Sequence, residues 1–242
     1  MRFMLLLYDR EPTDESPEDE AIFEAYAAFD EEVASHGVYI HGQGLELSPT
    51  ARALRQTAEG DVMVTDGPFI ETREQLGGFY ILECLSMEEA QAWAAKIPAA
   101  ATGRVEVRTM AGHERRLLEQ PGKPHFMALI YGDESRFVPL GSPEQRGIVD
   151  RHQRFTSALI DSGEFVTGDG LWLSKTARTV AVRDGETLVT DGPFAETREV
   201  LGGFCEVACD SLDRAIEIGS QLIFNDNGGI EIRPVLDMGS ME

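Results

Sequence analysis

The spacing of apolar positions predicts the first elements of the chain. Residues 3–8 form a continuous apolar run, which is typical of a central strand buried on both faces. Apolar positions between residues 22 and 33 then recur at helical spacing, and a second stretch of this kind covers residues 148–159. Gly37 and Gly163 follow these stretches and are suited to end a helix. The chain therefore opens with a strand and a helix, and a similar helix occurs in its second half.

Serine and turn residues mark the other predicted elements. Ser16-Pro17 and Ser142-Pro143 predict helix N-caps followed by proline in the first turn, and Ser86 and Ser211 predict caps of a second helix in each half. Hairpins are predicted to turn at Glu59-Gly60 and Asp184-Gly185. The predicted strands after the first helix of each half are 38–45, 78–84 and 105–110, and 165–173, 203–209 and 230–236.

One fifteen-residue stretch occurs twice. TDGPFIETREQLGGF spans residues 65–79 and TDGPFAETREVLGGF spans residues 190–204, so the copies are 125 residues apart. Similar residues align along most of the two halves at nearly this offset. We therefore expect a tandem duplication, with one repeat at 1–118, a Pro- and Gly-containing linker at 119–124 and a second repeat at 125–242.

Each repeat has the predicted order strand, helix, strand, hairpin, strand, helix, strand. This is the split βαβ, ferredoxin-like pattern of the α+β class. Such a sheet carries its helices on one face and must bury the other. We therefore expect the two repeats to pack sheet to sheet as an internal pseudo-dimer, a dimeric α/β-barrel within one chain.

Composition narrows the range of partners. The 242 residues are 42% hydrophobic and 26% charged, as in globular proteins, and the formal net charge is -22. This charge repels nucleic acid and anionic lipid, and the acidic stretch at residues 11–20 is expected to be an exposed loop and helix start. No apolar run is long enough to span a membrane and no signal peptide is recognisable, so we expect a cytoplasmic protein without nucleic-acid or membrane partners.

Metal and cofactor motifs are not recognisable. Cys84, Cys205 and Cys209 form neither a disulfide framework nor a zinc spacing, so buried free thiols are expected. The histidines other than His152 show no metal-ligand spacing, and phosphate-binding glycine loops and nucleophile elbows are not found. We expect no metal and no cofactor.

The duplicated stretch allows both a chemical and a structural interpretation. Asp66 and Asp191 can move protons while Arg73 and Arg198 bind a substrate carboxylate. Alternatively, the aspartates cap a turn and the arginines pair with neighbouring acids, which the chemistry favours. Phe69 and Phe194 are expected to anchor the turn in the core. The glycine pairs 77–78 and 202–203 are expected to permit a β-bulge or the close approach of a backbone or ligand. Glu106 with Arg108, and Glu231 with Arg233, are interpreted as local ion pairs.

The copies differ on the first helix, where His152 occupies the apolar face at the position of Tyr26. An imidazole facing the sheet can act as an acid or base, with Asp169 as its first candidate partner and Asp191 as the second. Tyr26 is able to hydrogen-bond a ligand. The structural alternative is that both side chains belong to the core.

The paired DGPF, ETRE and LGGF segments, with VEVR and IEIRP at the ends of the repeats, resemble the YCII-related family in its DGPF-motif branch. The resemblance implies a dimeric α+β-barrel of ferredoxin-like units. It also implies that members are often encoded beside extracytoplasmic-function sigma factors. Some relatives in the wider superfamily act on small molecules without a metal, with a His-Asp pair as the proposed catalytic centre. The histidine of that pair corresponds to His152, whereas the first repeat departs from the pattern with Tyr26.

Two functions follow. One is a metal-independent small-molecule enzyme, such as an isomerase, decarboxylase or lyase, in which His152 acts as acid or base, Asp169 orients it and Arg198 or Arg73 holds an anionic substrate. The other is a non-catalytic regulatory module that binds a protein of sigma-factor type or a small ligand. The sequence leaves further oligomerisation open.

Overall fold

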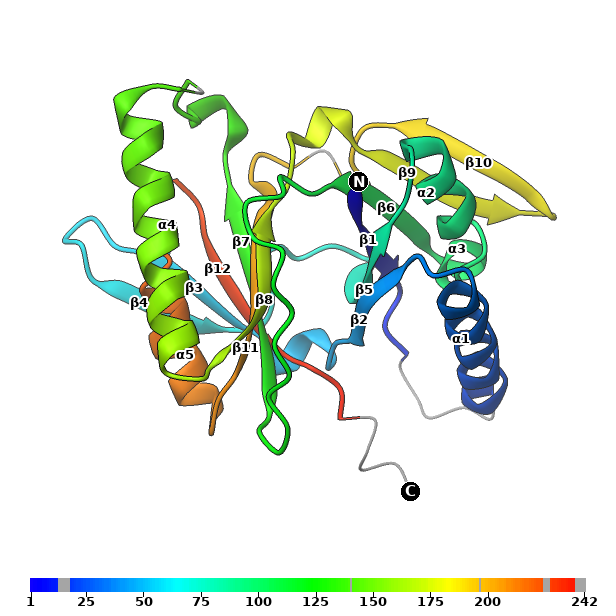
Figure 1. Cartoon of the computed structure of the whole chain (residues 1–242), viewed down its shortest axis with the longest axis horizontal. Helices are drawn as coiled ribbons and strands as arrows, with labels where there is room; N and C mark the ends of the chain where they lie inside the picture. Colours follow the sequence, from blue (N-terminus) through cyan, green and yellow to red (C-terminus); the bar gives the residue numbers. More distant parts are fainter. Residues whose placement is uncertain (13–17, 140, 196, 224–226, 238–242) are drawn as a thin grey trace. The chain divides into compact units, whose positions relative to one another are not determined.

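The computed structural model describes residues 1–12, 18–139, 141–195, 197–223 and 227–237 (Figure 1). Within them the chain forms two compact units. The first unit consists of Met1–Leu45, Glu71–Ala111 and Leu171–Glu196, and the second of Glu46–Ile70, Gly112–Gly170 and Thr197–Glu242. Each unit thus contains segments of both halves of the sequence. The repeat boundaries at 118 and 125 stay a prediction. They divide the sequence into its two copies, whereas each compact unit combines segments of both copies.

The first unit is built on a six-stranded sheet in the order β10-β9-β6-β1-β5-β2. Every pair of neighbouring strands in it is antiparallel. Its strands are β1 (Arg2–Asp9), β2 (Tyr39–Gly44), β5 (Gln75–Glu83), β6 (Arg104–Thr109), β9 (Arg178–Arg183) and β10 (Glu186–Asp191). Its helices are α1 (Glu18–Ser35), α2 (Met87–Ala94) and α3 (Ala99–Thr102), with the short 3-10 turn η3 (Ser174–Thr176).

The second unit repeats this plan with a sheet in the order β4-β3-β12-β7-β11-β8. Its strands are β3 (Arg52–Gln56), β4 (Val62–Asp66), β7 (His125–Gly132), β8 (Phe165–Gly170), β11 (Val200–Ala208) and β12 (Gly229–Pro234). Its helices are α4 (Pro143–Asp161) and α5 (Leu212–Ser220), with the 3-10 turns η1 (Ser48–Thr50) and η2 (Glu134–Arg136).

The four strands that come from one repeat in each unit have the order expected of a ferredoxin-like fold. In the first unit β6-β1-β5-β2 places the fourth, first, third and second strands side by side, and β12-β7-β11-β8 does the same in the second. The α+β, ferredoxin-like prediction is confirmed at this level.

The two hairpins are exchanged between the repeats. In the second unit, β3 pairs with β12 through Ile230 and Leu54, and in the first unit β9 pairs with β6 through Val105 and Val180. Figure 1 shows the exchange by colour, because the cyan β3–β4 hairpin lies beside the red β12 and the yellow β9–β10 hairpin beside the green β6. The order of elements predicts the hairpins but not this pairing.

Local sequence signals explain where elements begin and end. The Ser142 side chain accepts a hydrogen bond from the Gln145 N–H at the start of α4, with Pro143 in the first turn, as predicted. Ser86 and Ser211 cap α2 and α5 in the same way. Gly37 and Gly163 both have φ +68, which lets the chain leave α1 and α4 in a left-handed conformation. Ser16 and Pro17 lie outside the described residues.

The duplicated stretch anchors each exchanged hairpin. In the second unit the Phe69 N–H donates to Glu231 Oε2 at 2.7 Å, and the Phe69 ring stacks on Tyr131 with centroids 4.9 Å apart. Glu231 also accepts from Arg233 Nη2 at 2.5 Å, and both of these side chains are at most 2% exposed. The DGPF and IEIR segments, which have counterparts in the other repeat, therefore meet in one buried contact.

The first unit contains the equivalent contact. The Phe194 N–H donates to Glu106 Oε2 at 2.8 Å, Arg108 Nη1 donates to Glu106 Oε1 at 3.0 Å, and Phe194 stacks on Tyr8 at 4.6 Å. The ion pairs predicted here are thus present, but they are buried and serve the hairpin. In each unit, the DGPF turn, the buried glutamate and the arginine two residues after it together hold the exchanged hairpin in place.

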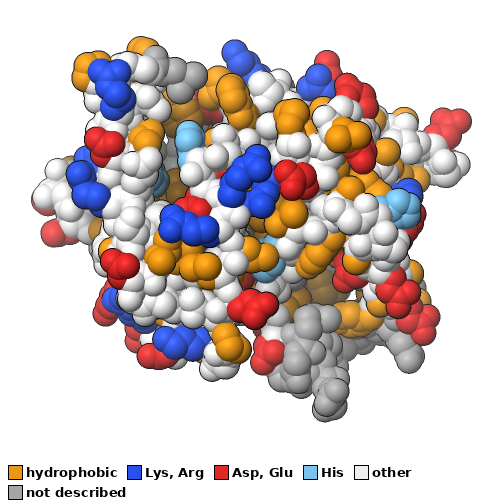
Figure 2. Space-filling model, viewed as in Figure 1, with side chains coloured by type: hydrophobic (Ala, Val, Ile, Leu, Met, Phe, Trp, Pro, Cys, Tyr) orange, Lys and Arg blue, Asp and Glu red, His pale blue; other side chains and the backbone are white. Residues whose placement is uncertain are grey.

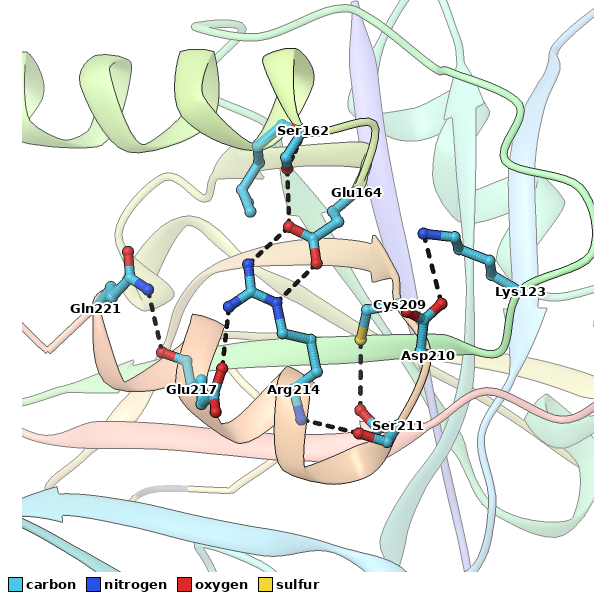
Figure 3. Close-up of polar contacts among 10 residues, drawn as sticks. Lys123, Ser162, Glu164, Cys209, Asp210, Ser211, Arg214, Glu217 and Gln221 are labelled. Carbon is cyan, nitrogen blue, oxygen red and sulfur yellow. Dashed lines mark hydrogen bonds and ion pairs between the residues drawn. The ribbon is translucent and has the colours of Figure 1, made fainter.

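An ion pair fixes α5 to the end of α4 in the second unit (Figure 3). Arg214 on α5 donates to both Glu164 oxygens, at 2.7 and 2.8 Å, and Ser162 Oγ donates to Glu164 Oε2 at 2.7 Å. The Arg214 guanidinium lowers the pKa of Glu164 to about 2. This contact ties α5 to the turn between α4 and β8.

Candidate functional site

A cavity of about 610 Å³ lies between α4 and the sheet of the second unit. Figure 2 shows the surface hollowed beside α4, at the left of the view. A smaller hollow of about 290 Å³ shares Ile130, Phe137, Ile148, His152 and Leu222 with it. The lining is mainly apolar with a few polar groups, which is the usual character of a small-molecule site.

The glycine pair of β11 gives this cavity part of its wall. The register of β11 against β7 shifts between Leu201 and Gly203, so a β-bulge occurs at the pair, as predicted. A Cβ on Gly203 would lie 3.0 Å from the Asp169 carbonyl oxygen. Gly202 and Gly203 both line the cavity, and the missing side chain of Gly203 permits the close approach of the β8 backbone.

His152 lines both hollows from α4. Burial lowers the pKa of its imidazole to about 4, and the charges of Arg151 and His113 act in the same direction. The imidazole is therefore neutral at pH 7. A neutral ring presents one donor and one acceptor nitrogen, which suits it to hydrogen-bond a ligand or take up a proton.

Asp169 on β8 is among the residues that line the larger cavity, and its side chain is fully buried behind the cavity wall rather than exposed to the open space. Its carboxylate accepts three backbone N–H groups, from Gly112 at 2.7 Å, His113 at 3.1 Å and Gly170 at 2.8 Å. Burial raises the pKa of Asp169, while these hydrogen bonds oppose the rise. The carboxylate is thus held in one orientation.

His113 is a residue that the sequence interpretation missed. Its Nδ1 lies 3.8 Å from Asp169 Oδ1, its side chain is 66% exposed, and it lines the same cavity. It belongs to the segment after β6, which also carries Glu114 and Arg116 to the cavity wall and whose Leu118 N–H donates to the Val166 carbonyl on β8. Residues in a segment that joins two repeats carry no periodic signal, so no pattern marked them.

The structure therefore brings together His152 and Asp169, the first pair predicted from the sequence, as lining residues of one cavity. The imidazole recorded beside the Asp169 carboxylate is that of His113. The partnership of Asp169 with His152 stays a prediction.

The two aspartates of the duplicated stretch lie at hairpin ends. Asp66, in the second unit, is 89% exposed and pairs with Arg52 at 3.1 Å. Asp191, in the first unit, is 88% exposed and pairs with Arg178 at 3.1 Å. Their surroundings match the structural interpretation more closely than a buried proton-transfer site does.

The two arginines that were predicted to bind an anion do not line either hollow. The Arg198 side chain is 80% exposed and its Nε donates to Asp133 Oδ2 at 2.9 Å. Arg73 is exposed in the first unit. The basic residues that line the hollows of the second unit are instead Arg116 and Arg136.

Tyr26 lies in the first unit, where it packs against the apolar core. Burial raises the pKa of its phenol to about 12, so the group is protonated at neutral pH. This position matches the structural alternative for Tyr26.

Metal ligands and membrane spans were sought in the described part of the chain. No group of three or more His, Cys, Asp and Glu side chains converges there as a possible metal site. None of the described helices is both long and apolar enough to cross a membrane. On the face shown in Figure 2, basic side chains are scattered among acidic and apolar ones.

Comparison with known proteins identifies the family. The model of the YCII-related domain matches twice, at residues 1–111 and 125–239. The chain belongs to the YCII-related family. An uncharacterized protein of Rhizobium meliloti (strain 1021) is 36% identical over 118 residues, which cover 46% of this chain and 93% of that protein. That relative therefore has about the length of one repeat of this YCII-related chain.

A solved structure has a similar fold. The crystal structure described as a "Putative Chlorite dismutase" matches with a TM-score of 0.51 and 10% sequence identity, over 99% of this chain and 96% of that one. At this identity the likeness concerns the fold alone. It agrees with the ferredoxin-like architecture of this YCII-related chain.

Proposed function

We propose that this chain is a metal-independent enzyme that binds a small organic molecule in the cavity of its second unit and transfers a proton there. The observation that carries the proposal is one apolar cavity of about 610 Å³ lined by both His152 and Asp169. An isomerase, decarboxylase or lyase needs a group that takes up or delivers a proton beside an apolar binding wall.

His152 is the acid or base in this proposal. Because burial keeps the imidazole neutral at pH 7, its unprotonated nitrogen is available to accept a substrate proton. The resulting imidazolium needs a compensating negative charge. We propose that Asp169, whose carboxylate is held by three backbone N–H groups in the wall of the same cavity, is the source of that charge.

The other residues that line the cavity orient the substrate in this proposal. Ile148 and Phe155 from α4 offer an apolar wall for the body of the molecule. Arg116 and Arg136 line the hollows, whereas Arg198 and Arg73 do not, so we propose them as the groups that attract an anionic substrate; Arg116 would have to exchange its ion pair with Glu114 for the substrate. We therefore transfer the anion-binding role from the duplicated stretch to these two residues.

Three finer features accompany this proposal. We place the chain in the DGPF-motif branch of its family, because DGPF and ETRE occur in both repeats. Each ferredoxin-like sheet has a face opposite its helices that needs cover, which supports an internal dimeric α/β-barrel. We also propose a cytoplasmic location, which the free, buried thiols of all three cysteines support because such thiols are typical of a reducing compartment.

The second candidate is a regulatory module that binds a protein, such as one of sigma-factor type. Its support is the apolar exposure of the two sheet edges, where Met63 and Val64 on β4 and Leu188 and Val189 on β10 are 43% to 50% exposed. Such a module needs no proton-transfer group in a cavity.

The test compares His152→Ala and His152→Gln with the wild-type chain on a panel of small aromatic and carboxylated compounds. We expect turnover to fall by about 10²-fold or more, because a general acid or base contributes on that scale. The matched control is His36→Gln, which alters an exposed histidine in the first unit. Unchanged turnover in both His152 variants would reject the catalytic role given to His152, whereas a wild-type chain that turns over none of the compounds would favour the regulatory module.

A further inference from the structure

The two repeats place side chains of different size at equivalent positions between the first helix and the sheet. The first repeat has Tyr26, Asp30, Tyr80 and Trp93 where the second has His152, Thr156, Cys205 and Ile218. These pairs follow from the offsets of 125 and 126 residues that align the copies. Three of the four changes replace an aromatic side chain by a smaller one.

In the first unit these larger side chains pack on one another. Tyr80 is 8% exposed and its hydroxyl donates to Asp30 Oδ1 at 2.7 Å. Its ring meets Phe29 edge-on, with centroids 5.0 Å apart, and Phe29 also meets Trp93 at 6.4 Å. The Tyr80 ring further covers Gly42, since a Cβ on that glycine would lie 2.7 Å from Tyr80 Cδ1.

In the second unit the equivalent residues border open space. Phe155, Thr156 and Cys205, the counterparts of Phe29, Asp30 and Tyr80, all line the 610 Å³ cavity. Burial raises the pKa of the Cys205 thiol to about 12, so it remains protonated and acts as a small apolar side chain. The cavity thus occupies the place that the Tyr80 ring fills in the first unit.

We propose that the chain binds one ligand, in the second unit, and that the residue at position 205 decides this. A tyrosine at the equivalent position closes the site in the first unit, and a cysteine keeps it open in the second. The ligand class is a compact molecule with an aromatic body, matched to the space of one aromatic side chain. This inference rests on the cavity used in the proposed function, but not on catalysis.

The test counts binding sites with the compact aromatic anion benzoate, titrated into the full chain by calorimetry. We expect one site per wild-type chain. Cys205→Tyr should weaken binding at least tenfold. Cys209→Ala is the matched control, because it alters a buried cysteine that does not line the cavity and should leave binding unchanged.

A second variant keeps the test decisive if Cys205→Tyr does not fold. Cys205→Tyr combined with Thr156→Asp supplies the carboxylate that Tyr80 finds in Asp30, so the buried hydroxyl has a partner. The reverse change, Tyr80→Cys in the first unit, should add a second binding event. Circular dichroism and thermal unfolding establish that each variant is folded before binding is measured.

The outcomes separate this inference from the proposed function. Two sites in the wild type, no binding by the wild type, or undiminished binding by folded Cys205→Tyr variants would overturn the single-site inference. Loss of binding in those variants together with undiminished turnover in His152→Ala would instead retain the single site and reject the catalytic role of His152.

Discussion

The buried glutamates Glu106 and Glu231 connect the two most recognisable sequence segments of each repeat. Each accepts a hydrogen bond from a phenylalanine N–H of the DGPF turn and one from an arginine two residues further along its own strand. A buried acid with two such partners is costly to leave incomplete, because its desolvation is offset only while both bonds are made. Repetition of these residues is therefore explained by packing.

Replacing Glu231 by glutamine tests that explanation. Glu231→Gln removes the charge that compensates the buried Arg233 guanidinium, and we expect the free energy of unfolding to fall by about 3–5 kcal/mol. Urea denaturation measures the change. Glu186→Gln, at an exposed position of β10, should change the same quantity by less than about 0.5 kcal/mol. Equal stability of the two variants would contradict the anchoring role.

The lowered pKa of His152 predicts a pH dependence of stability. Its folded pKa of about 4 lies below the unfolded value of 6.5, so the unfolded chain binds more protons between these values. This residue's contribution therefore falls as pH drops from 6.5 to 4, by at most about 3 kcal/mol.

Unfolding free energies of the wild type and His152→Gln at pH 4, 5, 6 and 7 check this. The glutamine variant should lose less stability towards pH 4. His125 gives the opposite sign, because its hydrogen bond with Glu206 raises its pKa and its contribution is lost as pH rises through the folded value. Parallel curves for wild type and His152→Gln would show that the imidazole does not titrate as the burial implies.

At the residue scale, the sequence pointed to His152 because the two copies differ there while the helical spacing is kept, and it offered Asp169 as a candidate partner. The structure brings both residues to one cavity. The sequence could not identify His113 or Arg116. Their positions depend on how the segment after β6 lies along β8, which is fixed by the Asp169 and Leu118 hydrogen bonds. Such contacts follow from tertiary structure and leave no spacing in the sequence.

At the scale of elements, the strands, helices and caps follow from local signals, whereas the partner of each hairpin does not. Asp184 and Gly185, with φ 52 and 79, make the predicted tight turn of β9–β10. An antiparallel edge has the same hydrogen-bonding groups whichever hairpin pairs with it. Side chains instead determine which sheet edge each hairpin pairs with. Phe69 and Phe194 stack on Tyr131 and Tyr8 in the sheets that their hairpins join.

Phe69→Ala should loosen one exchanged hairpin. Phe69 is 8% exposed, stacks on Tyr131 and lies under the Arg55 guanidinium at 3.8 Å. We expect about 3–5 kcal/mol of destabilisation, by the usual cost of truncating a buried phenylalanine. Amide hydrogen exchange should accelerate most in β3 and β4. Phe23→Ala, at a 41% exposed position of α1, is the control and should leave that exchange unchanged.

At the scale of the whole molecule, duplication and hairpin exchange have a joint consequence. A relative has the length of one repeat, whereas this chain contains two. Because each compact unit contains strands from both halves, neither half holds all six strands of a sheet. The covalent connection therefore raises the effective concentration of each half for the other, while the paired strands of the exchanged hairpins hold the two halves together.

Cutting the chain between the repeats tests this last point. A protease site inserted after Gly122, where the backbone is exposed, would separate residues 1–122 from 123–242. The pairing of β3 with β12 and of β9 with β6, together with the buried contacts of Phe69 and Phe194, should keep the fragments together. We expect them to co-elute in gel filtration after cleavage and to separate only in denaturant. The uncut chain with the same insertion is the control, and fragments that separate under native conditions would mean that the exchanged hairpins are not what joins the halves.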